Sequence, residues 1–102
     1  METSLNQQVI DCLHTIYDPE IPVNIYDLGL IYEVNIREGN KVGIVMTLTA
    51  PNCPAAQSLP LEVNEKVSAI PGVVDVHVNI TWTPKWEKSM VSEVAQLELG
   101  WL

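Results

Sequence analysis

The residue whose type and setting best suit chemistry is Cys53, which lies between Pro51 and Pro54 in the stretch LTAPNCPAA. If a strand precedes it and Pro54 begins a helix, the thiol lies near unsatisfied backbone N–H groups at the positive end of a helix dipole. That setting favours the thiolate, which binds soft metals, holds iron–sulfur clusters or attacks electrophiles. The alternative interpretation is a small residue that fills a turn.

Few other thiols are available to this chain. The second cysteine, Cys12, lies beside the apolar stripe of a predicted helix and is interpreted as a packing residue. Without a Cys-x-x-Cys motif, the sequence supports neither a dithiol redox pair nor a four-cysteine metal site within one chain. Because nothing indicates secretion, we expect both thiols to be free.

Carboxylates form a second candidate cluster, with Asp18, Glu20 and Asp27 in a loop that contains two prolines. Such a cluster can bind a hard cation or receive a basic partner. It can also make Asx-type turn hydrogen bonds, and this turn role is the one favoured for Asp18.

Histidines could assist the thiol, but nothing in the sequence ties His14 or His77 to Cys53. His77 lies on the polar face of a predicted strand, where it is either a ligand or base, or an exposed side chain without a role. A cysteine hydrolase needs a histidine and an orienting group within reach of its thiol, and no glycine-rich phosphate loop is present. We therefore predict that the protein is not an enzyme.

Hydrophobic periodicity predicts the elements that would position these residues. They are a helix over 5–17, strands over 30–37 and 42–49, a helix from 54 to about 70, a strand over 74–82, and a helix over 90–99 with Gly100 as its C-cap. Alternating strands with one apolar face need helices to cover that face. The order α-β-β-α-β-α thus predicts an α+β fold, a two-layer α/β sandwich whose three-stranded sheet leaves a polar face open.

The first helix carries two further expectations. Thr3 or Ser4 can cap its start, and it should end near Tyr17 because Pro19 disfavours helical geometry in the residue before it. His14 points away from the apolar stripe and is expected to be solvated.

Other expectations concern the second helix and the strands. Pro60 should either kink its helix or delay the start of the helix, because it removes a backbone hydrogen bond. Strand alternation places Thr47 and Thr49 on the polar face, and it places Val74 and Trp82 on the apolar face.

Bulk properties narrow the class of protein. The 102 residues fit one domain over residues 1–102. A formal charge of -8, with only 5 scattered basic residues, argues against nucleic acid as a partner. No apolar run approaches the roughly 20 residues that cross a bilayer, and the N-terminus lacks a secretory pattern. We expect a cytoplasmic protein with no membrane partner.

Four blocks of the sequence together resemble the SufT-like family of iron–sulfur cluster assembly accessory proteins. The blocks are DPEIPVNIYDLGLIYEV, TLTAPNCPAA, IPGVVDVHVNITWTPKW and SEVAQLELG, and the resemblance runs from Val9 to Gly100. The same domain is found in the eukaryotic cytosolic iron–sulfur targeting complex. A related branch matures a phenylacetate-degradation oxygenase and carries a cysteine-rich tail, whereas this sequence stops at LGWL, so that function ranks second.

The resemblance implies a fold related to the C-terminal domain of NifU-type scaffolds and an accessory role in assembling clusters or transferring them to apo-proteins. It implies that Cys53 is the reactive cysteine, which holds a transient cluster or iron rather than a tightly bound cofactor. The residues expected to support the thiol or bind partners are Asp18, Glu20, Asp27, Thr49, His77, Ser92 and Glu93, of which His77 comes from the strand pattern alone.

The implied partners are the iron–sulfur assembly machinery and apo client proteins. A cluster shared between two Cys53 thiolates would need a homodimer or a heterodimer, because one thiolate leaves most iron coordination sites open. The alternative function is a binding adaptor for client proteins without metal chemistry. Trp82, Pro84 and Trp86 resemble the family's Trp-x-Pro-x-Trp loop, and we expect the tryptophans to pack the last helix onto the sheet.

Overall fold

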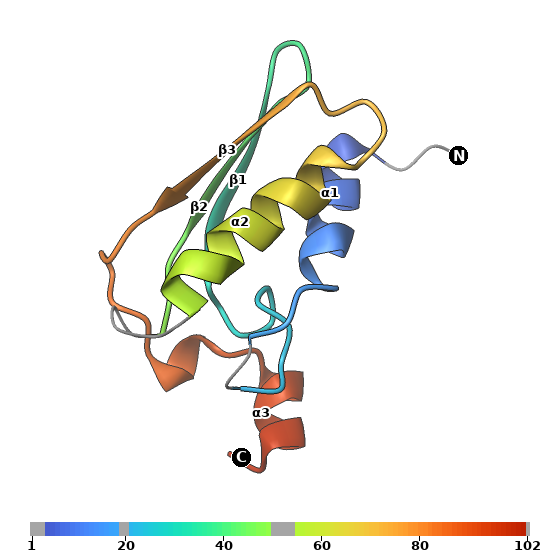
Figure 1. The fold of residues 1–102 in the computed structure, drawn as a ribbon. Helices are drawn as coiled ribbons and strands as arrows, with labels where there is room; N and C mark the ends of the chain where they lie inside the picture. The colour runs from blue at the N-terminus through green and yellow to red at the C-terminus, as the bar shows by residue number, and fades with distance from the viewer. Residues whose placement is uncertain (1–3, 19–20, 50–54, 102) are drawn as a thin grey trace.

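The computed structural model describes residues 4–18, 21–49 and 55–101, and it confirms the predicted α+β fold (Figure 1). The elements are α1 (Leu5–Leu13), β1 (Ile31–Arg37), β2 (Lys41–Met46), α2 (Ala55–Ser68), β3 (Asp75–Ile80), the 3₁₀ turn η1 (Lys88–Met90) and α3 (Glu93–Leu99). α1 packs against α2 and β1, and α2 packs against β3, so these two helices cover one face of the sheet. α3 lies beyond the end of the sheet (Figure 1).

The middle strand, β2, pairs with its two neighbours in different directions. With β1 it forms the predicted antiparallel hairpin, whose turn contains Gly39 and Asn40 at φ 76° and 57°. With β3 it pairs in parallel, and α2 makes the crossover that a parallel pair requires. β2 and β3 therefore end at the same edge of the sheet.

The apolar face of the sheet forms the core with α1 and α2, as the alternation predicts. Val42, Ile44 and Met46 of β2 are each at most 2% exposed. Full burial of a side chain of this size stabilises the fold by about 1.5–3 kcal/mol. The helices contribute the buried residues Val9, Leu13, Leu59, Val63 and Val67.

The opposite face of the sheet is open and polar over most of its length. Asn35, Gly43 and His77 form a row across the three strands because they are register partners. The next row includes Lys41 and Asp75, and both rows line a shallow hollow of about 220 Å³.

α1 begins as predicted but ends about one turn earlier than expected. The Ser4 hydroxyl caps the helix. The prediction of an end near Tyr17 is wrong, because the helix stops at Leu13. The residues that follow pair with segment 23–25 instead, and Tyr17 forms an isolated bridge with Asn24.

Predictions at the strand ends are wrong at three residues. Thr47 is fully buried because the chain after β3 folds over this end of the polar face, where the Tyr32 hydroxyl donates to the Pro84 carbonyl at 2.7 Å. Val74 and Trp82 are 71% and 45% exposed. Both lie outside the paired part of β3, so strand alternation does not fix their direction.

The later helices depart from the predicted bounds in two places. α2 already includes Pro60, so a start delayed past this residue is wrong. The proline lies early in a 14-residue helix and removes one backbone hydrogen bond. α3 begins at Glu93 rather than near residue 90 because η1 intervenes, and Gly100 ends it at φ 76° as predicted. None of the helices described is long and apolar enough to cross a bilayer.

The chain after β3 returns to the loop over residues 21–30 and packs tightly against it. The Trp86 indole N–H donates to the Leu28 carbonyl at 2.7 Å. Gly29 has φ 84°, and a Cβ at this position would lie 2.5 Å from the Met90 carbonyl oxygen. Both the backbone angle and the close approach therefore require glycine here.

Candidate functional site

A pocket opens at the sheet edge where both parallel strands end. Leu48 and Thr49, which follow β2, line it together with Trp82, Lys85 and Trp86, which follow β3. Its volume is about 190 Å³. Binding sites of open α/β sheets commonly lie at the carboxyl ends of parallel strands, because the segments leaving the strands converge there. The predicted supporting residue Thr49 thus lies at a place suited to binding.

The two tryptophans of this pocket differ in how firmly they are held. Trp86 packs against the core, and its hydrogen bond to Leu28 fixes the indole ring. Trp82 leaves 45% of its surface exposed. Trp86 therefore packs against the core and the loop before β1, while Trp82 forms an exposed aromatic wall of the pocket. That the tryptophans pack α3 onto the sheet stays a prediction.

Cys53, the predicted reactive residue, lies outside the described residues, as does Glu20. Its position in the chain is nevertheless bounded by Thr49, just after β2, and by Ala55, the first residue of α2. Thr49, the last described residue before Cys53, lines the pocket. The ionisation of the thiol stays a prediction.

Asp18 closes the loop that follows α1. The residue is 5% exposed, and its carboxylate Oδ1 accepts a hydrogen bond from the Ile21 N–H at 3.0 Å. The Asp18 N–H also donates to the Val23 carbonyl at 3.3 Å. These bonds agree with the turn role favoured for Asp18, which stabilises the loop from inside.

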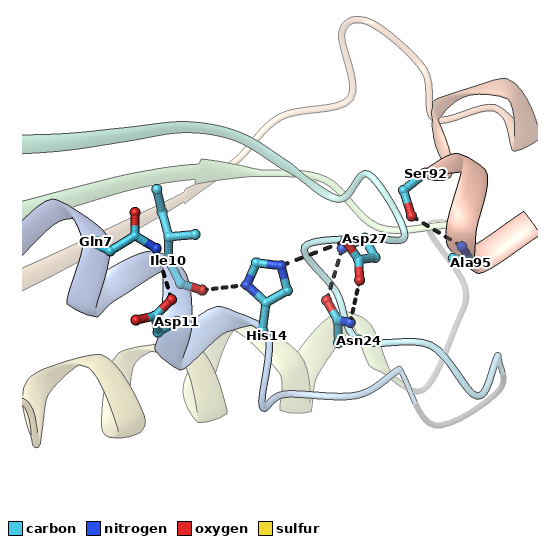
Figure 2. Close-up of polar contacts among 8 residues, drawn as sticks. All are labelled: Gln7, Ile10, Asp11, His14, Asn24, Asp27, Ser92 and Ala95. Atoms are coloured by element: carbon cyan, nitrogen blue, oxygen red, sulfur yellow. Dashed lines mark hydrogen bonds and ion pairs between the residues drawn. The ribbon is translucent and has the colours of Figure 1, made fainter.

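Asp27 is held by hydrogen bonds at both its backbone and its side chain (Figure 2). Its N–H donates to Asn24 Oδ1 at 2.9 Å, and its Oδ2 accepts from Asn24 Nδ2 at 2.9 Å. The imidazole Nε2 of His14 lies 3.6 Å from Asp27 Oδ1. The carboxylate is oriented by these neighbours while remaining partly exposed.

His14 is a surface residue as predicted, with 39% of its side chain exposed, but it also makes contacts that the helical pattern does not predict. Its Nδ1 lies 2.9 Å from the Ile10 carbonyl, and its ring stacks on Tyr26 with centroids 4.5 Å apart. A histidine at the end of a helix commonly bonds a carbonyl of the last turn. The spacing of four residues from Ile10 was the sequence signal for this contact, while the pairing with Asp27 had none.

The structure joins Asp27 to the start of α3. The Ser92 N–H donates to the Asp27 carbonyl at 2.8 Å. The Ser92 hydroxyl caps the helix by accepting from the Ala95 N–H (Figure 2). Glu93 follows as an exposed residue of the first turn. Two candidates far apart in the sequence, Asp27 and the Ser92–Glu93 pair, therefore belong to one region.

His77 is not brought to this region. It is exposed on the open face, opposite Gly43 of β2. Gly43 lies three residues before Met46, the end of β2, which is roughly 10 Å at about 3.3 Å per residue.

Cys12 is a half-buried free thiol. Burial raises its pKa, and the charge of Lys66 opposes that rise, which fits the predicted packing role. In the described ranges, no three His, Cys, Asp or Glu side chains gather to hold a metal ion.

Comparison with known sequences gives consistent matches. The model of a family described as iron–sulfur cluster assembly protein matches residues 6–80. A Porphyromonas gingivalis protein named Fe-S protein maturation auxiliary factor is 51% identical over 96 residues, which are 94% of this chain and 91% of that protein. The Bacillus subtilis protein named Fe-S protein maturation auxiliary factor YitW is 37% identical, with 98% of each chain covered.

Comparison with solved structures agrees on the fold. The crystal structure of a Bacillus anthracis domain titled as one of unknown function, DUF59, matches with a TM-score of 0.89 and 35% sequence identity. The match covers 94% of this chain and 92% of that one. It therefore extends over nearly the whole fold described above.

Proposed function

Because this chain belongs to the iron–sulfur cluster assembly protein family and serves as an accessory factor in iron–sulfur protein maturation, we propose that Cys53 is the residue through which it acts. In this proposal the Cys53 thiolate coordinates iron, alone or in a cluster, as cargo. Cysteine thiolates of an apo-protein then replace it by ligand exchange, which changes no oxidation state and leaves the Cys53 thiolate free. The role is delivery rather than enzymatic turnover.

The observation that carries this proposal is the convergence of two segments at one sheet edge. Thr49 after β2 and Trp82 after β3 line the same pocket, and the connection with Cys53 begins directly after Thr49. A reactive group on that connection would have an apolar pocket next to its point of departure. Such a pocket supports the recognition of a partner's side chain during transfer.

The number of thiolates supports transient rather than permanent binding. Cys12 belongs to the packing of α1, so Cys53 is the one cysteine left as a ligand. A single thiolate leaves most iron coordination sites to other ligands, including those of a receiving protein. Sharing a cluster between two chains through their Cys53 residues is part of the same proposal.

Anaerobic reconstitution with ferrous iron and sulfide tests this function. Native protein, Cys53→Ser and the matched control Cys12→Ser are compared by visible absorbance, by iron per chain and by transfer to an apo-ferredoxin. We expect Cys53→Ser to lose iron loading and transfer, whereas Cys12→Ser keeps both. Equal loading and transfer by Cys53→Ser would show that the thiol has no role.

A binding adaptor without metal chemistry is the second candidate, and the exposed apolar side chains Val94 and Leu97 of α3 favour it. The two functions differ in their requirement for the thiol. In a cell that depends on this protein, an adaptor keeps the activity of client iron–sulfur enzymes normal when Cys53 is replaced by serine. A cluster-carrying factor loses that activity.

A further inference from the structure

α3 has a second apolar side that the fold does not use. Ala95 is 3% exposed and Leu99 packs against the core, whereas Val94 and Leu97 are 65% and 63% exposed. At roughly 100° per residue, Val94 and Leu97 lie about 60° apart and roughly 150° from the buried pair. Val94 and Leu97 are called the α3 stripe here, and Trp101, which follows the C-cap, is 37% exposed.

The α3 stripe is presented by a helix whose ends are both fixed. An isolated helix of seven residues would not persist in water. Here the Ser92 hydroxyl caps its start. At its end the Gly100 N–H donates to Leu97 and the Trp101 N–H donates to Gln96, the two bonds of a Schellman motif. A partner would therefore meet a preorganised surface and would not have to order it.

Charges around the α3 stripe select among partners. Glu93 and Glu98 lie on its two sides, each roughly 40° around the helix from the nearest stripe residue. In the part of the chain that the structure describes, neither carboxylate forms an ion pair. Lys88 is held near the end of α3 instead, with its Nζ 5.1 Å from the centre of the Trp101 ring.

This arrangement argues against a second copy of the chain as the occupant. A symmetric dimer through the α3 stripe would bring Glu93 and Glu98 of both copies into one interface. Both copies carry a formal charge of -8, which adds to the repulsion. A different protein whose apolar surface is bordered by lysine or arginine would bury the α3 stripe and place opposite charges beside Glu93 and Glu98.

We infer that the α3 stripe is the docking surface for a partner protein, bound through an amphipathic helix whose apolar face is bordered by Lys or Arg. Apolar side chains three residues apart on α3 form a short ridge that packs into the groove of another helix. The inference goes beyond cluster chemistry, because none of these residues touches the pocket at the ends of β2 and β3.

Two synthetic helical peptides with the same leucine face test the inference, one bordered by lysine and the other by glutamate. Each is titrated into the native chain and followed by calorimetry and by backbone amide shifts. We expect the lysine peptide to bind with shifts concentrated in residues 93–101, to weaken as salt is raised, and the glutamate peptide not to bind. Equal binding of both peptides, or shifts elsewhere, overturns the inference.

Matched variants separate docking from general attraction between a basic peptide and an acidic protein. Val94→Gln with Leu97→Gln should weaken the lysine peptide at least tenfold, whereas Leu61→Gln, which alters a leucine 65% exposed on α2, should not. Because all three residues are exposed, folding should be little affected. Equal affinities of the lysine peptide for the native chain and for the Val94→Gln, Leu97→Gln variant overturn the inference. So does self-association of the native chain in analytical sedimentation, if Leu97→Gln abolishes it. The Cys53→Ser variant should bind the peptide normally, so failure of one proposal leaves the other testable.

Discussion

α1 and α3 have similar N-terminal caps but different roles in the molecule. Each is a short helix capped by a serine hydroxyl, Ser4 in α1 and Ser92 in α3. α1 buries Val9 and Leu13 completely and packs against the sheet and α2. α3 fully buries only the small side chain of Ala95 and rests on the loop before β1, to which the Ser92 N–H is bonded.

The difference shows how similar local signals serve stability in one place and recognition in another. The caps and helix propensity determine that both helices form. The side on which the larger apolar residues lie then determines whether a helix stabilises the core or offers a surface. α1 places them inward, and α3 exposes Val94 and Leu97.

The largest expected contrast comes from removing one leucine from each helix. Leu13→Ala leaves a cavity beside fully buried neighbours and should lower the free energy of unfolding by about 2–5 kcal/mol. Leu97→Ala removes an exposed side chain and should change it by at most about 0.5 kcal/mol. Urea denaturation followed by far-UV circular dichroism measures both. Similar losses in the two variants would mean that α3 is part of the core.

A smaller contrast is expected at the caps. Ser4→Ala and Ser92→Ala each remove a hydroxyl that accepts a backbone N–H bond, at a typical cost of about 1 kcal/mol. In α1 this should appear as lower global stability. In α3 it should appear mainly as faster amide hydrogen exchange within residues 95–101, with little change in the urea midpoint. A drop in global stability for Ser92→Ala as large as for Ser4→Ala contradicts this view.

The smallest effect concerns the half-buried thiol of α1. Burial raises the pKa of Cys12 in the folded chain above its ordinary value of 9.0. Well below that pH the thiol is protonated in both states and contributes nothing to pH dependence. Above it the unfolded chain ionises first, so stability is lost as pH rises. Between about pH 7 and about pH 10, native protein should lose slightly more stability than Cys12→Ala. The midpoint of urea denaturation, measured at both pH values, tests this. An identical decrease of the midpoint in native protein and in Cys12→Ala would contradict the prediction.

The core was predictable because the burial of a strand follows its pleat. Val42, Ile44 and Met46 alternate with more exposed residues, and β2 buries those three side chains. The same reasoning failed at Thr47 and Val74, which lie outside the regular pairing. Burial there depends on long-range packing, such as the chain after β3 folding over Tyr32, and local periodicity contains no information about it.

The candidate site was less predictable than the core. The turn role of Asp18 follows from local chain geometry, and it was anticipated. The contact of His14 with Asp27 and the bond from Ser92 to Asp27 join segments distant in the sequence, so they emerge only when the chain is folded. The role of Cys53 rests on resemblance and topology, and the Cys53→Ser experiment addresses it directly.

The close contact between Gly29 and Met90 makes the orientation of α3 depend on a residue far away in the chain. A methyl group at position 29 would force the carbonyl of Met90 aside, and α3 starts only three residues later. Replacement of this glycine would therefore tilt the terminal helix while the strands keep their pairing. A defect in partner selection could thus originate in a loop that never meets the partner.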